Sequence, residues 1–569
     1  MSNRTYLSVD IGTSQTRVCL FDNQRGPFEL RSRAQSATTL QVGRDVRSGF
    51  IAAVEKLETQ TGRPLLDNRK HLMMSESGEA WGVSGAGLTF SASAPIRTII
   101  IGASEAYSLP ALRRLVSFFD CEIVLEINLQ QTLNETAQLE AMLAAQADLI
   151  VLAGGVEGGA ERALRVAIEN LRLLSHDPAR VSKVQIVYAG NSALAEFAER
   201  EIEAPADFHL AGNILPAIGW EDQSPAWAAM CSAFARVREQ QTPGLSELQL
   251  QLRQHALPVT FAYGRMARFL DGMRPQGRGV MLLDVGAGGV SVTAARHEAL
   301  YGLRFHPSLN SEALRQTHQL SGMNVDFHTT ADYLSNLMAH PEMLPATLEE
   351  MTIFQAWAQV KIRQALSALQ ELYPAFGWDE RSGLQNAYEP IIFSGELFSS
   401  TEALHQVLLT GLGGIMPHGI TTFVLDRSQI LAALGALAEV EPLVAAQVLD
   451  SDLFFNLGTV VNVDSPDREG SLALTLEVAE EESSRDFYSV SVGKLAHLGV
   501  LEGSRTDIYL SPEESCDVGM GMPGLGGWLT VAGGALGVII DARGRPLKLP
   551  EDDQKRAKLM NDWLWELGG

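Results

Sequence analysis

The chain has 569 residues, and at roughly 150 residues per domain this length predicts about four folding units. Lysine and arginine number 44 against 68 aspartates and glutamates, which gives a net charge of −24 and argues against binding nucleic acid or anionic lipid through bulk charge. Hydrophobic residues make up 46% of the chain and charged residues 20%, so a disordered or collagen-like main state is excluded.

The cysteines and the N-terminus indicate the compartment. Four cysteines lie far apart, and no pair has the Cys-x-x-Cys spacing of a zinc or redox site. Residues 1–6 are polar and lack the apolar core of a signal peptide. No uninterrupted apolar run reaches the length of about 18 residues that a membrane span needs. We therefore expect a cytoplasmic protein with no membrane contact.

The N-terminal segment predicts a hairpin with a polar tip. An apolar strand over residues 6–11 carries Asp10 near its end, and a second strand covers residues 17–21. The turn between them supplies one glycine and three hydroxyl side chains, namely Gly12, Thr13, Ser14 and Thr16. Glycine, serine and threonine are typical of such tips.

Residues 96–212 predict a parallel α/β domain. Apolar runs at 97–102, 121–127, 148–153 and 184–189 alternate with segments of helical periodicity. This rhythm is typical of a parallel sheet with helices on its faces. Open sheets of this kind place ligands at the carboxyl ends of their strands. Beyond this domain, residues 213–276 read as helical, and short alternating segments after residue 448 indicate a β-rich region.

A second segment repeats the N-terminal layout in the middle of the chain. A strand that begins at residue 279 ends near Asp284, and Gly286, Gly288 and Gly289 form the following turn. Backbone N–H groups at such a turn can cradle a phosphate, because glycine lets the backbone approach without a Cβ. An aspartate at the end of each first strand can hold water around a hydrated Mg2+.

A third segment follows a buried-looking strand. Apolar residues 390–393 lead directly into Ser394, Gly395 and Glu396. The glycine would let a nucleoside lie against the backbone. Each hairpin alone reads as an ordinary tight turn, whereas the three segments together indicate a nucleotide site shared by two halves of the chain.

These segments resemble the phosphate-1, phosphate-2 and adenosine motifs of the ATPase superfamily that includes actin, heat-shock proteins and sugar kinases. Pro258–Gly264 and Leu431–Ala438 lie where that superfamily keeps two connecting helices. Within the superfamily, the chain is similar to the MutL family, the accessory proteins of glutamate mutase. The closer match covers residues 1–440 and rests on residues 9–13, 154–155, 158–159, 189–191, 213–216 and 284–286.

The resemblance implies an α/β protein with a two-lobed actin-like ATPase fold, built from duplicated ribonuclease-H-like domains. An inserted parallel α/β domain and a β-rich C-terminal domain complete it. The expected domains are the N-terminal part of the first ATPase lobe (1–95), the inserted domain (96–212), a helical connecting region (213–276), the second ATPase lobe (277–447) and the β-rich C-terminal domain (448–569).

The resemblance also implies a function. It points to an ATP-binding protein that assists or reactivates an adenosylcobalamin-dependent mutase such as glutamate mutase, with ATP and Mg2+ as cofactors. Asp10 and Asp284 would be the catalytic and metal-holding carboxylates. The phosphates would contact Gly12, Thr13, Ser14, Thr16, Gly286, Gly288 and Gly289, and the adenosine would border Ser394, Gly395 and Glu396.

Two departures from the family pattern bear on hydrolysis. Arg17 stands in the first hairpin, which has no lysine, and Gly289 and Ser291 occupy places that usually hold a threonine and an aspartate. Because positioning and charge stabilisation dominate phosphoryl transfer, these losses predict weak hydrolysis or none. Two alternatives stay open: a small-molecule kinase of the sugar type, for which no aspartate base can be identified, and a non-catalytic scaffold that keeps the actin-like fold.

Overall fold

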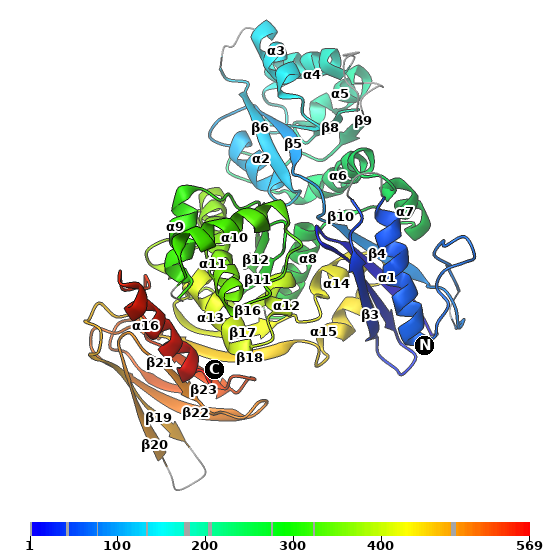
Figure 1. Cartoon of the computed structure of the whole chain (residues 1–569). Helices are drawn as coiled ribbons and strands as arrows, with labels where there is room; N and C mark the ends of the chain where they lie inside the picture. The colour runs from blue at the N-terminus through cyan, green and yellow to red at the C-terminus, as the bar shows by residue number, and fades with distance from the viewer. Residues whose placement is uncertain are drawn as a thin grey trace. The chain divides into compact units, whose positions relative to one another are not determined.

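Two sheets with the same strand order form the framework of this chain. They are seen in a computed structural model that describes residues 3–40, 45–76, 78–131, 135–175, 183–202, 207–274, 277–322, 325–479 and 485–568 (Figure 1). The chain divides into two compact units, each described by itself below. The first comprises Met1–Ala262, Gly302–Arg304 and Ala432–Gln447, and the second comprises Tyr263–Tyr301, Phe305–Leu431 and Val448–Gly569.

The first unit contains a five-stranded sheet in the order β10-β4-β1-β2-β3. Its strands are β1 (Thr5–Ile11), β2 (Gln15–Asp22), β3 (Glu29–Ala37), β4 (Gly85–Phe90) and β10 (Leu257–Pro258). The first three form an antiparallel meander, and β4 and β10 run parallel to β1. Every residue of β4 is buried, as expected of a strand covered on both faces.

Helix α1 (Val46–Thr61) packs against β2 and β3. The carboxylate of Asp45 caps it by accepting the N–H of Arg47, and Gly62 ends it with a φ of 69°. The sequence reading expected no helix here. The missed signal is the helical spacing of the residues that the helix buries, namely Val46, Gly49, Phe50, Ala53, Val54 and Leu57.

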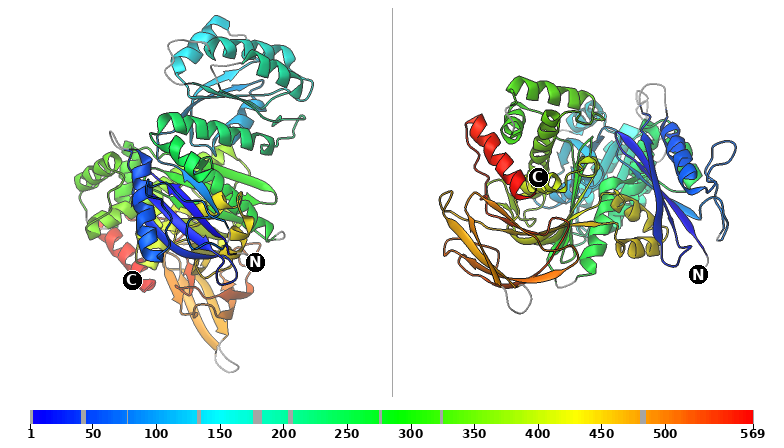
Figure 2. Two further views of the ribbon diagram at one scale, coloured as in Figure 1. Left: turned by 90° about the vertical axis from the view of Figure 1, so that its right-hand side faces the viewer. Right: turned by 60° about the horizontal axis from the view of Figure 1, so that its bottom comes forward.

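The inserted part of the first unit has a sheet of five parallel strands in the order β6-β5-β7-β8-β9 (cyan in Figure 2). The strands are β5 (Ile96–Gly102), β6 (Cys121–Asn128), β7 (Leu149–Ala153), β8 (Gln185–Tyr188) and β9 (Asp207–Leu210). This order is that of a doubly wound fold. The four strands expected from the apolar runs are confirmed within two residues, whereas β9 was not expected.

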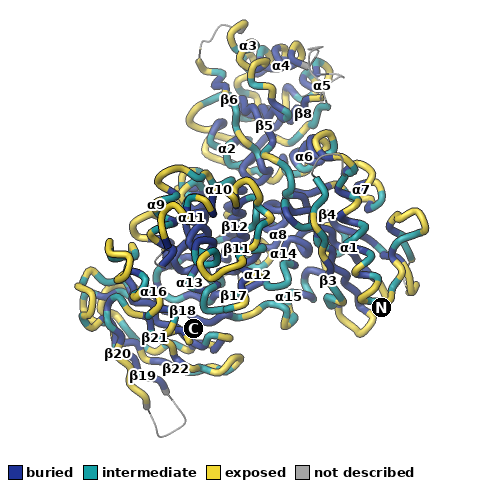
Figure 3. The backbone as a smooth tube through the Cα atoms, in the orientation of Figure 1, coloured by how far each residue is buried: buried dark blue, intermediate teal, exposed yellow. Residues whose placement is uncertain are grey.

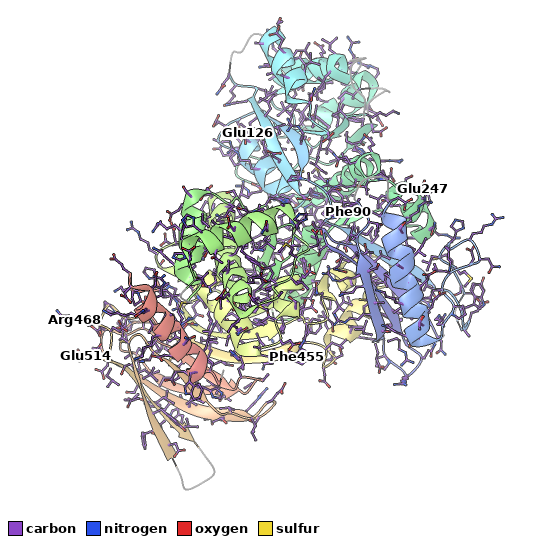
Figure 4. All side chains as sticks on the ribbon, in the orientation of Figure 1. Phe90, Glu126, Glu247, Phe455, Arg468 and Glu514 are labelled. Carbon is purple, nitrogen blue, oxygen red and sulfur yellow. The ribbon has the colours of Figure 1, made fainter. Side chains whose placement is uncertain are left out.

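Helices alternate with these strands and enclose a core of their own. They are α2 (Ser108–Val116), α3 (Glu135–Ala145), α4 (Glu161–Ser175) and α5 (Ala195–Glu201). Buried side chains of β5, β7 and β8 and of α3, α4 and α5 form one apolar cluster. On the surface, Glu126 of β6, labelled in Figure 4, accepts a hydrogen bond of 2.9 Å from Nε of Arg113 on α2.

The segment after the inserted sheet is helical, as the sequence predicts. It contains α6 (Trp227–Gln241), α7 (Leu245–Leu252) and α8 (Val259–Gly272), and Pro258 directly precedes α8. Later in the chain, α14 (Leu431–Leu437) approaches α8 closely. A Cβ added to Gly435 would lie 2.2 Å from the carbonyl oxygen of Ala262, so only glycine permits this crossing. Helix α15 (Pro442–Leu449) follows.

The second unit repeats the first sheet and extends it. Its eight-stranded sheet has the order β13-β12-β11-β16-β17-β18-β24-β21. The repeated strands are β11 (Gly279–Val285), β12 (Val290–Arg296), β13 (Ala299–Phe305), β16 (Tyr388–Ser394) and β17 (Gly419–Leu425). As in the first unit, the middle strand pairs antiparallel with its hairpin partner and parallel with the next strand. The predicted duplicated α/β layout is therefore confirmed.

Further helices of the second unit precede β17 in the chain. They are α9 (Ser311–Leu320), α10 (Phe327–Ala339), α11 (Leu348–Leu372), α12 (Glu396–Ser400) and α13 (Leu404–Ile415). Helix α11 packs against α9, α13 and β12, and Figure 3 shows the buried residues gathered in this region. Among the described residues, no helix has both the length and the apolar character needed to cross a membrane.

The C-terminal region is rich in strands, and it forms two layers. Strands β18 (Phe455–Asn462), β21 (Leu495–Leu498) and β24 (Val538–Asp541) continue the sheet beyond β17. A second sheet contains β19 (Leu472–Ala479), β20 (Arg485–Ser491), β22 (Arg505–Pro512) and β23 (Gly527–Ala532). Both layers share one apolar core. The sequence reading did not anticipate the last helix, α16 (Asp553–Glu566).

Candidate functional site

The first hairpin joins β1 to β2 in the first unit. The N–H of Gly12 donates to the carbonyl oxygen of Gln15 at 3.0 Å and closes the tip. A Cβ on Gly12 would lie 3.1 Å from that oxygen, so the turn favours glycine. Oγ1 of Thr13 donates to the carbonyl oxygen of Ser91 at 3.2 Å. The tip is therefore a tight turn that is held in place by the strand region next to it.

Asp10 lies near the carboxyl end of β1, and both of its oxygens accept hydrogen bonds within the first unit. Oδ2 is 3.2 Å from Nη1 of Arg17, its cross-strand neighbour, and Oδ1 accepts from Oγ1 of Thr89 at 2.8 Å. The side chain of Arg17 keeps only 14% of its surface exposed, and that of Asp10 keeps 15%. Protein groups thus position this carboxylate, and metal-bound water would share it with Arg17.

The hydroxyl groups of the first turn have different surroundings. Thr16 is fully buried, and its Oγ1 lies 3.0 Å from Oγ1 of Thr38, which donates to the carbonyl oxygen of Gly12 at 2.8 Å. Ser14 is also buried. Thr16 therefore holds the turn to the neighbouring strand, and its contact with a phosphate stays a prediction.

The second hairpin, in the second unit, has the same geometry. The N–H of Gly286 donates to the carbonyl oxygen of Gly289 at 3.0 Å, with the three-residue spacing found in the first hairpin. Asp284 faces Ser291 across the strands, in the position that Arg17 occupies in the first hairpin. The two hairpins therefore have the same local structure. They differ in that the second has Ser291 where the first has Arg17.

The third segment lies directly beside the second hairpin. Strand β16 runs parallel to β11 and pairs Ser394 with Asp284 in register. Gly395 has a φ of 96°, and a Cβ there would lie 2.4 Å from Oδ1 of Asp284 and 2.6 Å from the carbonyl oxygen of Val285. Ser394 is 1% exposed and donates its Oγ hydrogen to Asp426 at 3.1 Å. Both residues thus serve internal packing, and their contact with adenosine stays a prediction.

A pocket of about 270 Å3 opens beside the second hairpin. It is lined by three residues of the predicted site, Gly286, Gly288 and Glu396, so the structure brings the second and third segments to one cavity. Its volume is near the lower limit of small-molecule sites, which span roughly 300–1,000 Å3. Much of the remaining wall is apolar and includes Leu337, Met343, Leu344, Phe354, Trp357 and Leu397.

Two polar residues of this pocket were missed by sequence reasoning. His306 follows β13, and Lys361 lies in α11. The sequence predicts a helix over 345–373 but assigns no function to it. The available signal is that Lys361 follows Phe354 and Trp357 at spacings of seven and four residues, which places a cation on an otherwise aromatic helix face.

The loops of the inserted domain that contribute to the family resemblance form one network. Oδ1 of Asn191 accepts the N–H of Gly158 at 3.1 Å, and its Nδ2 donates to the carbonyl oxygen of Gly159 at 2.9 Å. Nδ2 of Asn213 donates to Oε1 of Glu157 at 2.7 Å. These loops follow β7, β8 and β9, at the edge where parallel sheets place ligands and partners.

The expected Mg2+ site depends on two carboxylates that belong to different units. Asp10 belongs to the first unit and Asp284 to the second. Among the residues that the structure describes, no group of three or more histidines, cysteines, aspartates or glutamates is placed to hold a metal ion. Magnesium commonly keeps several waters and binds through one or two carboxylates and substrate phosphates. Each hairpin carboxylate suits that pattern, and its metal role stays a prediction.

Comparison with known proteins gives no match among curated proteins. Solved structures to which the chain is similar include nucleotide-free acetone carboxylase, at 10% identity and a TM-score of 0.32, covering 86% of this chain and 81% of that one. A nucleotide-free diol dehydratase-reactivating factor has 11% identity and a TM-score of 0.31, covering 77% and 99%. A glycerol dehydratase reactivase has 12% identity and a TM-score of 0.30, covering 77% and 100%.

A family model provides the assignment. The model described as MutL protein matches residues 6–453. This span contains both hairpins, the third segment and every residue that lines the pocket beside the second hairpin. The chain therefore belongs to the MutL family.

Proposed function

We propose that this protein binds ATP with Mg2+ and acts as a chaperone-like accessory protein that assists or reactivates an adenosylcobalamin-dependent mutase such as glutamate mutase. The observation that carries the proposal is the pocket beside the Gly286 turn, where the second and third segments of a MutL-family chain meet. Glutamate mutase is the client that the family resemblance implies.

The pocket offers a nucleotide three kinds of contact. At Gly286, a Cβ would meet a single atom at 3.5 Å, so the turn leaves room for a phosphate to approach the backbone. The carboxylate of Glu396 can accept hydrogen bonds from ribose hydroxyl groups. Phe354 and Trp357 give the base an aromatic wall. These contacts correspond to the phosphate, the ribose and the base of a nucleotide.

Asp10 and Asp284 are proposed to hold the water shell of the metal. Magnesium, when bound, would neutralise part of the phosphate charge. Asp284 suits this role because it lies in register with the third segment. Asp10 is already paired with Arg17, so we expect slow turnover of ATP.

Titration calorimetry with ATP and Mg2+ tests nucleotide binding. We expect the wild-type protein to bind, and Asp284→Ala to bind at least about tenfold more weakly because a hydrogen-bonding charge is lost. Asp379→Ala changes an exposed carboxylate of β14 (Trp378–Asp379) in the same unit and should leave affinity unchanged. Absence of heat with the wild type, together with an unchanged melting temperature in ATP, would contradict ATP binding.

The accessory role needs a separate experiment with glutamate mutase that carries damaged cobalamin. We expect mutase activity to return only when this protein, ATP, Mg2+ and intact adenosylcobalamin are all present. Equal recovery without ATP would favour the scaffold alternative. No recovery, although ATP binds, would contradict the accessory role while leaving the nucleotide site in place.

A further inference from the structure

Lys361 is a buried cation for which the sequence provides no role. It lies in α11 and is 4% exposed. Lysine is rarely this buried unless it is paired, because an ammonium loses its hydration when it leaves water. It lines the pocket beside the second hairpin and is the one lysine or arginine among the described residues that line it.

The face of α11 that lines the pocket changes character along the helix. Phe354, Trp357 and Lys361 are spaced by three and four residues, so they share one face, and all three line the cavity. At about 1.5 Å per residue, Phe354 and Lys361 are about 10 Å apart along the helix axis. A ligand that lies along this face meets aromatic rings at one end and a positive charge at the other.

The two hairpins differ in the positive charge that they bring to their turns. In the first hairpin, the guanidinium of Arg17 is paired with Asp10. In the second hairpin, the equivalent position holds Ser291, so this hairpin brings no cation from that position to the Gly286 turn. Residues of that turn and Lys361 line the same pocket, so α11 supplies the positive charge that the second hairpin lacks at that position.

We propose that Lys361 binds the phosphate groups of a nucleoside polyphosphate and makes this pocket select nucleotides over nucleosides. The proposal rests on ATP binding at the same pocket. An ammonium has three N–H donors, so Lys361 can keep a protein acceptor and still donate to a phosphate oxygen. The aromatic end of the helix face then receives the base, and Glu396 lies in the same pocket to accept from the ribose.

The test compares ATP and adenosine binding by calorimetry with the full chain. For Lys361→Met we expect ATP affinity to fall about 10- to 100-fold, because a charge-assisted hydrogen bond is lost, and adenosine affinity to change less than about twofold. Lys361→Arg keeps the charge and should retain most of the preference for ATP. Lys558→Met, which changes an exposed lysine of α16, is the matched control and should alter neither affinity.

The ratio of ATP affinity to adenosine affinity decides the outcome. An unchanged ratio in Lys361→Met overturns the proposal, whether both affinities fall or neither does. Should Lys361→Met melt without a cooperative transition, the same ratio in Lys361→Arg and Lys361→Gln replaces it, with Gln expected to lose the preference. A wild type that binds neither ligand contradicts the nucleotide site itself and this proposal with it. A wild type that binds both equally contradicts the role of Lys361 alone.

Discussion

At the scale of single residues, two glycines of the site serve different physical purposes. A Cβ on Gly395 would overlap Oδ1 of Asp284 at 2.4 Å, and its φ of 96° is one that side chains rarely adopt. A Cβ on Gly286 would meet its nearest atom, the carbonyl oxygen of Gly289, at 3.5 Å. Gly395 is therefore required by packing, whereas Gly286 leaves space at the pocket.

This difference predicts that the same substitution has different effects at the two positions. Gly395→Ala should lower the free energy of unfolding by roughly 2–5 kcal/mol, because backbone strain and overpacking add. Gly286→Ala should change it by less than about 1 kcal/mol but weaken ATP binding, because the methyl group occupies space beside the turn. Urea unfolding and ATP titration of both variants check this. Equal destabilisation would contradict it.

At the scale of elements, the end of β24 depends on a buried charge. Asp541 is fully buried and accepts hydrogen bonds from Nε of Arg543 at 2.9 Å and from Nη2 of Arg545 at 3.0 Å. Burial alone raises the pKa of Asp541, but the two guanidinium groups outweigh it and hold this pKa well below its ordinary value of 3.8. Arg543 also lies over the ring of Trp563, 5.1 Å from its centre, which ties β24 to α16.

Asp541→Asn is expected to lower the free energy of unfolding by roughly 3–5 kcal/mol at pH 7, because two buried arginines lose their counter-charge. The folded pKa is depressed, so the stabilisation is present above the unfolded pKa of about 3.9 and is lost as the pH falls below it. The difference in free energy of unfolding between the wild type and Asp541→Asn should therefore become smaller below about pH 4.

Urea unfolding at pH 7, 4 and 3 measures that difference. Asp507→Asn, at an exposed position of β22, is the control and should cost less than about 0.5 kcal/mol at each pH. A difference for Asp541→Asn that stays constant across this range would show that the charge of Asp541 is not the cause.

At the scale of the whole molecule, the family match and the structural unit end at different places. The match ends at residue 453, whereas β18 begins at Phe455 and pairs with β17 along its whole length. The apolar core shared by the two C-terminal layers includes Val461 of β18 and Ile540 of β24. The last part of the chain therefore completes the second unit's sheet.

Truncation after residue 453 is expected to give an aggregating protein, because β17 becomes an exposed edge strand. The fragment 96–241 is the comparison. It keeps α6, which packs on β8 and β9, and it should be soluble and melt cooperatively because its sheet and helices enclose a core. Size-exclusion chromatography and thermal melting test both fragments. A monomeric truncated chain with a cooperative transition would contradict the expectation.

Local patterns account for the parts of the fold that were predicted. The two hairpins combine an apolar strand, an aspartate and a glycine turn, and the inserted domain alternates apolar runs with helical periods, so both are encoded within short windows. Helix α1 gives a weaker signal because Gly49 and Ala53, which are small and only weakly apolar, form part of its buried face. Strand β9 is four residues long and only partly buried, so it carries little signal.

The sequence by itself determined the family, the duplicated hairpins and the positions of Asp10 and Asp284, because each is a motif of neighbouring residues. Only the tertiary structure decided that Gly395 packs on Asp284, that Thr16 is buried, and that Lys361 lines one pocket with the Gly286 turn. The residues that meet in these contacts are distant in the chain. Packing between separate strands and helices brings them together, and no local sequence pattern records that packing.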